Sequence, residues 1–172
     1  MGGQKIILTE TDLYVASLVG IRRCINSAVL NFGNRGVTKS RMWDVDINGS
    51  LGELAFCRLM NIYFSATSEK PDKVDFLIGG VKVEIRTAFE SSSRLIIRRG
   101  DLDDAVFVLM TGAMLEFEFQ GWIWGKEGKM DGFVDAPANR TPAWFVPKES
   151  LRGLEELKQI LRDRSDGRLP GS

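Results

Sequence analysis

The stretch of residues 74–88 most constrains what this chain can fold into. It reads VDFLIGGVKVEIRTA, with apolar and polar residues alternating regularly after Gly79-Gly80 and, except at Leu77, before it. Alternation with a period of two is typical of a half-buried strand, and a Gly-Gly pair between two such runs predicts a two-residue hairpin turn. In such a hairpin Asp75 pairs with Glu84, with their Cβ atoms roughly 5 Å apart.

The two faces of this hairpin differ in chemistry. Alternation places the side chains of Lys82, Glu84 and Arg86 on the same face as that of Asp75. The other face is entirely apolar and consists of Phe76, Ile78, Val81, Val83 and Ile85. The sequence therefore predicts a sheet that buries one face and presents two carboxylates and two cations on the other.

Helical and strand-like patterns surround the hairpin and predict an α/β sandwich, with a central mixed β-sheet flanked by helices. Apolar residues recur at spacings of three and four from about residue 10, and this pattern predicts a long amphipathic helix that ends near Gly33. The apolar residues are Tyr14, Leu18, Ile21, Ile25, Ala28, Val29 and Phe32. A loop is expected over 33–48, a buried helix from about Ser50 to Met60, and a Leu-rich helix from Pro147. Further strands are expected at 94–98, 105–110, 115–125 and 143–146, with a loop over 126–142.

Length and composition indicate one domain. The chain has 172 residues, of which 44% are hydrophobic, and no linker divides it. We therefore expect a single domain over residues 1–163 and a flexible tail over 164–172. No apolar run is long enough to cross a bilayer and no signal peptide is evident, so a cytoplasmic protein without membrane partners is expected.

The absence of histidine excludes several kinds of chemistry. Without histidine there is no Ser-His-Asp or Cys-His catalysis, and Cys24 and Cys57 alone cannot complete a zinc site. Hydrolysis would have to use carboxylates, lysine and a hard metal ion with oxygen ligands. The 23 basic and 23 acidic residues balance, which permits a local basic groove without demonstrating one.

Three acidic residues point to a metal site. Asp75 and Glu84 would repel each other if no cation lay between them, and Mg²⁺ prefers carboxylate oxygens, backbone carbonyls such as that of Ile85, water and phosphate. Glu53 is predicted on a buried helix face, where a carboxylate needs a partner. Gly49 and Gly52 would let this helix approach the sheet closely. A Mg²⁺ or Mn²⁺ ion between helix and hairpin would account for all three acids.

The order of these motifs resembles the PD-(D/E)XK, or restriction-endonuclease-like, nuclease superfamily. A helix, a GxxGE helix and a D-x8-E-x-R hairpin followed by further strands cover roughly residues 10–125, and FEFQGWIWG is similar to small phage and resolvase-like members. The resemblance implies Glu53 as the helix glutamate, with Asp75 and Glu84 as the motif acids. Arg86 stands in place of the motif lysine. Asp72, in a literal Pro-Asp pair, lies three residues too early for the hairpin geometry.

Arg86 divides the functional hypotheses. Arginine stays protonated and cannot act as a general base, although it can contact phosphate and water. The first hypothesis is a metal-dependent DNA endonuclease or exonuclease with Glu53, Asp75, Glu84 and Arg86 as catalytic residues. The second is an inactive relative that binds nucleic acid or protein. The third is an unrelated α/β protein whose hairpin charges form only a surface ladder of ion pairs.

Basic residues outside the motif are candidates for DNA contacts. They are Lys39, Arg41, Lys82, Arg94, Arg98 and Arg99, which could follow a phosphate backbone or simply form a solvated face. The leucine row of the last helix is more typical of a core than of a dimer interface, and a homodimer is left open as a partner.

Overall fold

In the computed structural model, residues 3–29, 42–66, 74–137 and 141–165 are described. Two long helices precede most of the strands, as the sequence predicts. The helices and 3₁₀ turns are α1 (Glu10–Val29), α2 (Met42–Met60), α3 (Gly125–Gly128), η3 (Asp131–Phe133), η4 (Lys148–Ser150) and α4 (Leu154–Ser165). The strands are β1 (Gln4–Ile7), β2 (Phe76–Ile78), β3 (Val81–Ala88), β4 (Leu95–Ile97), β5 (Ala105–Ala113), β6 (Glu116–Trp124), β7 (Val134–Asp135) and β8 (Ala143–Val146).

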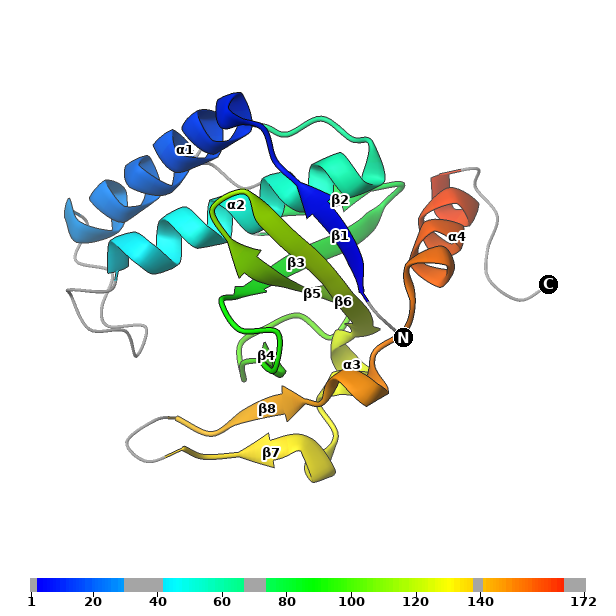
Figure 1. The fold of residues 1–172 in the computed structure, drawn as a ribbon. Helices are drawn as coiled ribbons and strands as arrows, with labels where there is room; N and C mark the ends of the chain where they lie inside the picture. The colour runs from blue at the N-terminus through cyan, green and yellow to red at the C-terminus, as the bar shows by residue number, and fades with distance from the viewer. Residues whose placement is uncertain (1–2, 30–41, 67–73, 138–140, 166–172) are drawn as a thin grey trace.

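The strands form two sheets. The larger has the order β1-β6-β5-β3-β2 and is mixed, because β3 and β5 are parallel whereas the other neighbours are antiparallel. The smaller is antiparallel, with the order β4-β8-β7. The predicted α/β class with a central mixed sheet is confirmed (Figure 1).

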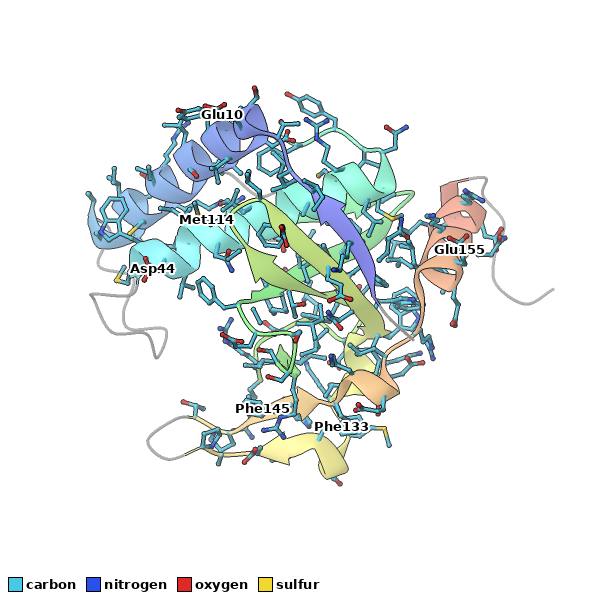
Figure 2. The ribbon with its side chains drawn as sticks, in the orientation of Figure 1. Glu10, Asp44, Met114, Phe133, Phe145 and Glu155 are labelled. Carbon is cyan, nitrogen blue, oxygen red and sulfur yellow. The ribbon has the colours of Figure 1, made fainter. Side chains whose placement is uncertain are left out.

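The two faces of the large sheet are covered differently. Apolar residues of α1, α2 and α4 pack with one face of the sheet in the main core. The other face packs against the small sheet in a second core, to which Phe133 also contributes (Figure 2). Helices therefore cover one face of the described sheet, and the small sheet covers the other.

Helix α1 begins at a reciprocal cap. The backbone N–H of Thr9 donates to Asp12 Oδ2 at 3.0 Å, and the Asp12 N–H donates to Thr9 Oγ1 at 3.2 Å. Asp12 also accepts hydrogen bonds from Arg58 near the end of α2. Burial opposes ionisation of Asp12, but the bonds from Arg58 and Thr9 outweigh it and lower the pKa of this carboxyl. One carboxylate thus caps α1 and ties it to α2, which runs antiparallel to it (Figure 1).

The apolar stripe predicted for α1 lies largely outside the core. Helix α1 is confirmed to Val29, but Tyr14 is 65% exposed, Leu18 66% and Val29 73%. The buried positions are instead Asp12, Ala16, Val19, Gly20 and Cys24. These are mostly small residues, because α1 packs so closely on α2 that larger side chains do not fit between them.

Helix α2 begins earlier than predicted. The structure places its first residue at Met42, so the loop expected over 33–48 is wrong for residues 42–48. Asn48 and Gly49 are weak helix formers, but tertiary contacts override that preference. The Asn48 side chain donates to the Gly112 carbonyl at 3.1 Å, and Ser50 Oγ donates to the Asp46 carbonyl at 3.1 Å. The helix ends as expected at Met60, where Asn61 adopts a left-handed conformation with φ 52°.

The C-terminal part differs from the prediction in detail. The expected strand over 143–146 is confirmed, but the loop over 126–142 contains α3, η3 and β7. The last helix begins at Leu154 rather than at Pro147, because Arg152 first pairs with Trp122 of β6 through two backbone hydrogen bonds of 2.8 and 3.1 Å. This helix continues to Ser165, beyond the domain end expected at 163, and the rest of the predicted tail lies outside the described residues. No helix in the described ranges has the length and apolar character needed to span a membrane.

The close packing of α1 on α2 yields a prediction about two helical glycines. A Cβ added to Gly20 would lie 2.5 Å from the Ile47 Cα and 2.8 Å from the Asp46 carbonyl oxygen, whereas one added to Gly49 would meet nothing within 4 Å. Gly20→Ala should therefore lower the free energy of unfolding by about 2 kcal/mol through overpacking. The matched control Gly49→Ala should raise it by about 0.5 kcal/mol through helix propensity. Urea unfolding of both variants measures the difference, and equal stabilities would contradict this packing.

Candidate active site

The β2–β3 hairpin has the predicted register. Phe76 pairs with Val83, Leu77 with Lys82 and Ile78 with Val81. The turn residues Gly79 and Gly80 have φ angles of 56° and 78°, which suit a turn with two left-handed positions and favour glycine at both. Extended by one pair, this register places Asp75 opposite Glu84.

Asp75 lies against β3. Its Oδ2 accepts a hydrogen bond of 2.7 Å from the backbone N–H of Ile85, the residue between Glu84 and Arg86. Val83 and Ile85 are buried in the main core, so the intervening Glu84 and Arg86 project to the other face, toward the small sheet. The acid that immediately precedes β2 thus borders the Glu-x-Arg segment of β3.

Four groups hold Arg86 in place. Its guanidinium lies 3.2 Å from Glu84 Oε2 and 2.7 Å from Asp101 Oδ2, and its Nε donates to the Ile96 carbonyl at 3.3 Å. Its Cζ lies 5.2 Å from the centre of the Phe107 ring. Arg86 is therefore a fixed, charged donor beside Glu84, braced by β4, β5 and the loop that follows β4.

Asp101 was not among the residues predicted for the site. It accepts one hydrogen bond from Arg86 and another, of 2.7 Å, from the backbone N–H of Arg98. It lies in a turn 15 residues after Arg86, and nothing in the local pattern links the two. Only the packing of β4 against β5 brings this carboxylate to the guanidinium.

Glu53 is buried, as predicted, but its partner is an arginine of α1. Arg23 Nη1 and Nη2 donate to the two carboxylate oxygens of Glu53 at 2.7 and 2.8 Å, and Nη1 also lies 3.2 Å from Ser50 Oγ. Glu53 is 6% exposed. Such a two-pronged pair is the strongest arrangement for an arginine and a carboxylate. No local pattern pointed to Arg23, because it lies outside the apolar stripe predicted for this helix.

Asp75 shares this electrostatic environment. Burial disfavours the charged form of Arg23, but hydrogen bonds and charge from Glu53, together with the charges of Asp75 and Asp46, outweigh it and raise the pKa of Arg23. Burial, with the charges of Glu53 and Asp75, likewise raises the pKa of the Cys57 thiol to about 12. Cys57 is therefore a neutral core residue.

The three acids are not gathered around one point. Among the described residues no group of three or more Asp, Glu, Cys or His side chains is arranged to hold a metal ion. Glu53 is held by Arg23, Asp75 by the Ile85 N–H and Glu84 by Arg86. A metal ion was expected to offset the repulsion among these three acids. In the structure, guanidinium groups and a backbone N–H offset it instead. A ligand set of three acids does not fit this arrangement. Mg²⁺ often uses only one or two carboxylates, so Asp75 and Glu84 remain as the candidate ligands.

The basic residues predicted to contact DNA are in different situations. Lys39 and Arg41 lie outside the described residues. Lys82 pairs with Asp104 at 2.9 Å, and Arg94 pairs with Asp135 at 2.9 Å and stacks over Phe145. Arg98 and Arg99 are exposed in the turn whose Asp101 contacts Arg86, so the structure brings these two cations near the candidate site.

No protein-family model, curated protein or solved structure matches this chain.

The Arg23–Glu53 pair makes a stability prediction. Arg23→Met should lower the free energy of unfolding by about 3 kcal/mol, because it leaves a buried carboxylate without its main partner. The double variant Arg23→Met/Glu53→Met should recover most of that loss, since an apolar pair of similar size replaces two charges. The exposed neighbour Arg22→Met serves as the control and should change stability by about 0.5 kcal/mol or less. Equal losses for the single and double variants would show that the pair itself is unimportant.

Proposed function

We propose that the protein is a metal-dependent DNA nuclease of the PD-(D/E)XK kind. The observation that carries this proposal is the contact of the Asp75 carboxylate with the Ile85 N–H. It puts the acid that immediately precedes β2 directly beside Glu84-Ile85-Arg86 of β3. Mg²⁺ or Mn²⁺ held by Asp75 and Glu84, with the Ile85 carbonyl as a further oxygen donor, would supply Lewis-acid chemistry at a phosphodiester.

Arg86 would act as a permanent hydrogen-bond donor and not as a base. Its guanidinium is held by Asp101, the Ile96 carbonyl and the Phe107 ring. A donor that is fixed before substrate arrives can stabilise the negative charge of a phosphoryl transition state without reorganising. The exposed cations Arg98 and Arg99 lie on the adjoining turn and would contact the DNA backbone.

Glu53 would not bind the metal ion held by Asp75 and Glu84. Its carboxylate forms a closed, two-pronged contact with Arg23, and the charge of Asp75 acts on the same guanidinium. In this role Glu53 and Arg23 position the acidic end of the hairpin against α2. The proposal therefore retains the acids expected from the sequence but separates the positioning residue Glu53 from the metal-binding residues Asp75 and Glu84.

The Glu84–Arg86 pair favours a second candidate function. A guanidinium 3.2 Å from a motif carboxylate neutralises the charge that would attract a metal ion. In that case the protein would be an inactive relative that binds nucleic acid through its basic residues. Turnover separates the two candidates.

A cleavage assay tests the proposal. Wild-type protein should cut at least one of supercoiled, linear, single-stranded and branched DNA in Mn²⁺ or Mg²⁺ and should be inactive with chelator. Arg86→Ala should lower the rate by about 10²- to 10³-fold, the usual effect of losing one transition-state donor, whereas Arg86→Lys should keep or raise it. Glu84→Gln should abolish cleavage, and the exposed control Glu116→Gln should not change it. If neither wild type nor Arg86→Lys cuts any substrate, the inactive-relative function is favoured.

Thermal melting gives a separate test of metal binding by Asp75 and Glu84. A ligand that binds only the native state at about 100 times its dissociation constant stabilises it by about 2.7 kcal/mol, which corresponds to a rise in Tm of roughly 5 to 10 °C for a chain of this size. We expect Mn²⁺ to raise the Tm of wild type by such an amount and to leave that of Glu84→Gln nearly unchanged. The Glu116→Gln control should respond as wild type does. The same Mn²⁺ response in Glu84→Gln would place the ion elsewhere.

A further inference from the structure

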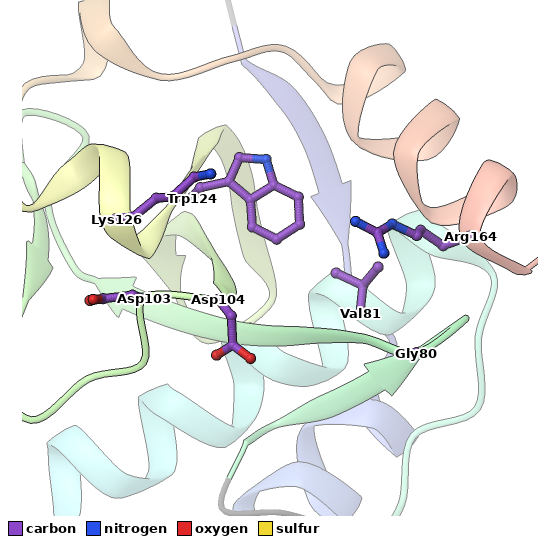
Figure 3. A pocket seen from close by; sticks show the side chains of 7 residues that line it. All are labelled: Gly80, Val81, Asp103, Asp104, Trp124, Lys126 and Arg164. Carbon is purple, nitrogen blue, oxygen red and sulfur yellow. The ribbon is translucent and has the colours of Figure 1, made fainter. Parts of the chain in front are cut away.

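A cavity lies at the end of the large sheet, away from the Glu84–Arg86 contact. Its volume is about 370 Å³, within the range of small-molecule sites. The β2–β3 turn, the loop before β5, the end of β6, the start of α3 and the end of α4 all contribute to its walls. The lining residues are Gly80, Val81, Asp103, Asp104, Trp124, Lys126 and Arg164 (Figure 3).

The two acids that line this cavity are paired with cations, whereas its two cations are not paired with acids among the described residues. Asp104 pairs with Lys82 at 2.9 Å, and Asp103 pairs with Lys129 at 2.6 Å, so a cation from outside the lining set offsets each acid. Within the described part of the chain, the side chains of Lys126 and Arg164 form no ion pair or hydrogen bond. The cavity thus presents two cations that no described acid offsets, and both are suited to an anionic group of a ligand.

An aromatic ring lies between these two cations. Figure 3 shows the Trp124 indole in the cavity, with Lys126 and Arg164 on opposite sides of it. The ring packs edge to face against the fully buried Trp122, with centroids 6.1 Å apart and an interplanar angle of 81°. Trp124 itself is half-buried and packs against the main core, so the ring is held in place and still borders the cavity.

We propose that this cavity binds a nucleotide, with the base stacked on Trp124 and the phosphate at Lys126 and Arg164, the cations that flank the ring. A base has a planar face that stacks on an aromatic side chain, and its phosphate suits ammonium and guanidinium donors. Inorganic phosphate would leave the indole unused, and an uncharged aromatic molecule would leave the cations unused. A free nucleotide and the terminal nucleotide of a DNA strand share this chemistry.

The proposed nucleotide site is separate from Asp75 and Glu84, the proposed metal ligands. Trp124 packs with the main core on the helix-covered face, whereas Glu84 projects to the face covered by the small sheet. Binding at the cavity requires no metal ion. Wild type and Glu84→Gln should therefore bind the nucleotide equally well in chelator. This result is expected whether or not the protein is a nuclease, so the two proposals can fail separately.

Calorimetric titration in chelator tests the nucleotide site. Deoxyadenosine monophosphate should bind at least about tenfold more tightly than either deoxyadenosine or inorganic phosphate, because only the nucleotide uses both the ring and the cations. Lys126→Ala and Arg164→Ala should each weaken its binding about tenfold, and the double variant should weaken it further. Arg162→Ala, an exposed arginine on the same helix that does not line the cavity, is the matched control and should bind as wild type does.

Two further measurements make the test decisive. Trp124→Leu should weaken nucleotide binding about tenfold and Trp124→Phe should retain most of it, with thermal melts to confirm that each variant is folded. Competition by a 5′-phosphorylated oligonucleotide, and not by its 5′-hydroxyl counterpart, would identify a strand end as the occupant; displacement by free nucleotides alone would identify a free nucleotide. The proposal is overturned if the nucleotide does not bind, if phosphate alone binds as tightly, or if the Lys126 and Arg164 variants bind as wild type does.

Discussion

Strand β5 is the element on which the rest of the structure depends. Seven of its nine residues, Ala105 to Thr111, are buried, and it pairs with β3 on one side and with β6 on the other. Val106, Val108 and Met110 belong to the helix-side core, whereas Ala105, Phe107 and Leu109 belong to the core beneath the small sheet. A strand buried on both faces must be apolar throughout, and that requirement organises two separate cores around one element.

The placement of β3 beside β5 determines the character of the candidate active site. Parallel pairing sets Glu84 next to Phe107 and Arg86 next to Leu109, so the polar side chains of β3 emerge beside apolar residues of the second core. Arg86 stacks on Phe107 and reaches the Ile96 carbonyl of the small sheet. Charged groups in such partly buried surroundings must be paired, and the Glu84–Arg86–Asp101 set meets that need without a metal ion.

Two arginines perform equivalent structural tasks on opposite sides of the hairpin. Arg23 reaches Glu53 from α1, and Arg86 reaches Glu84 within β3. Both pairs offset the cost of placing a carboxylate in a poorly solvated position. The difference between them lies in their surroundings. The Arg23–Glu53 pair is enclosed by the close packing of α1 on α2, whereas Arg86 borders the exposed turn that carries Arg98 and Arg99. This contrast is why we assign a positioning role to the first pair and a chemical role to the second.

The sequence by itself determined the hairpin, its register and the mixed α/β class. Alternation around Gly79-Gly80 fixes which residues face each other, because a shift by one position would move every apolar side chain to the wrong face. Long-range partners were decided only by the tertiary structure. The periodicity of α1 favoured Tyr14 and Leu18 for the core, but the buried face is the one whose small residues, such as Gly20, allow α2 to approach. The same close packing brings Arg23 to Glu53, and the docking of the small sheet brings Asp101 to Arg86. These contacts depend on how surfaces fit in three dimensions, and local patterns carry no information about which distant charge will meet a given carboxylate.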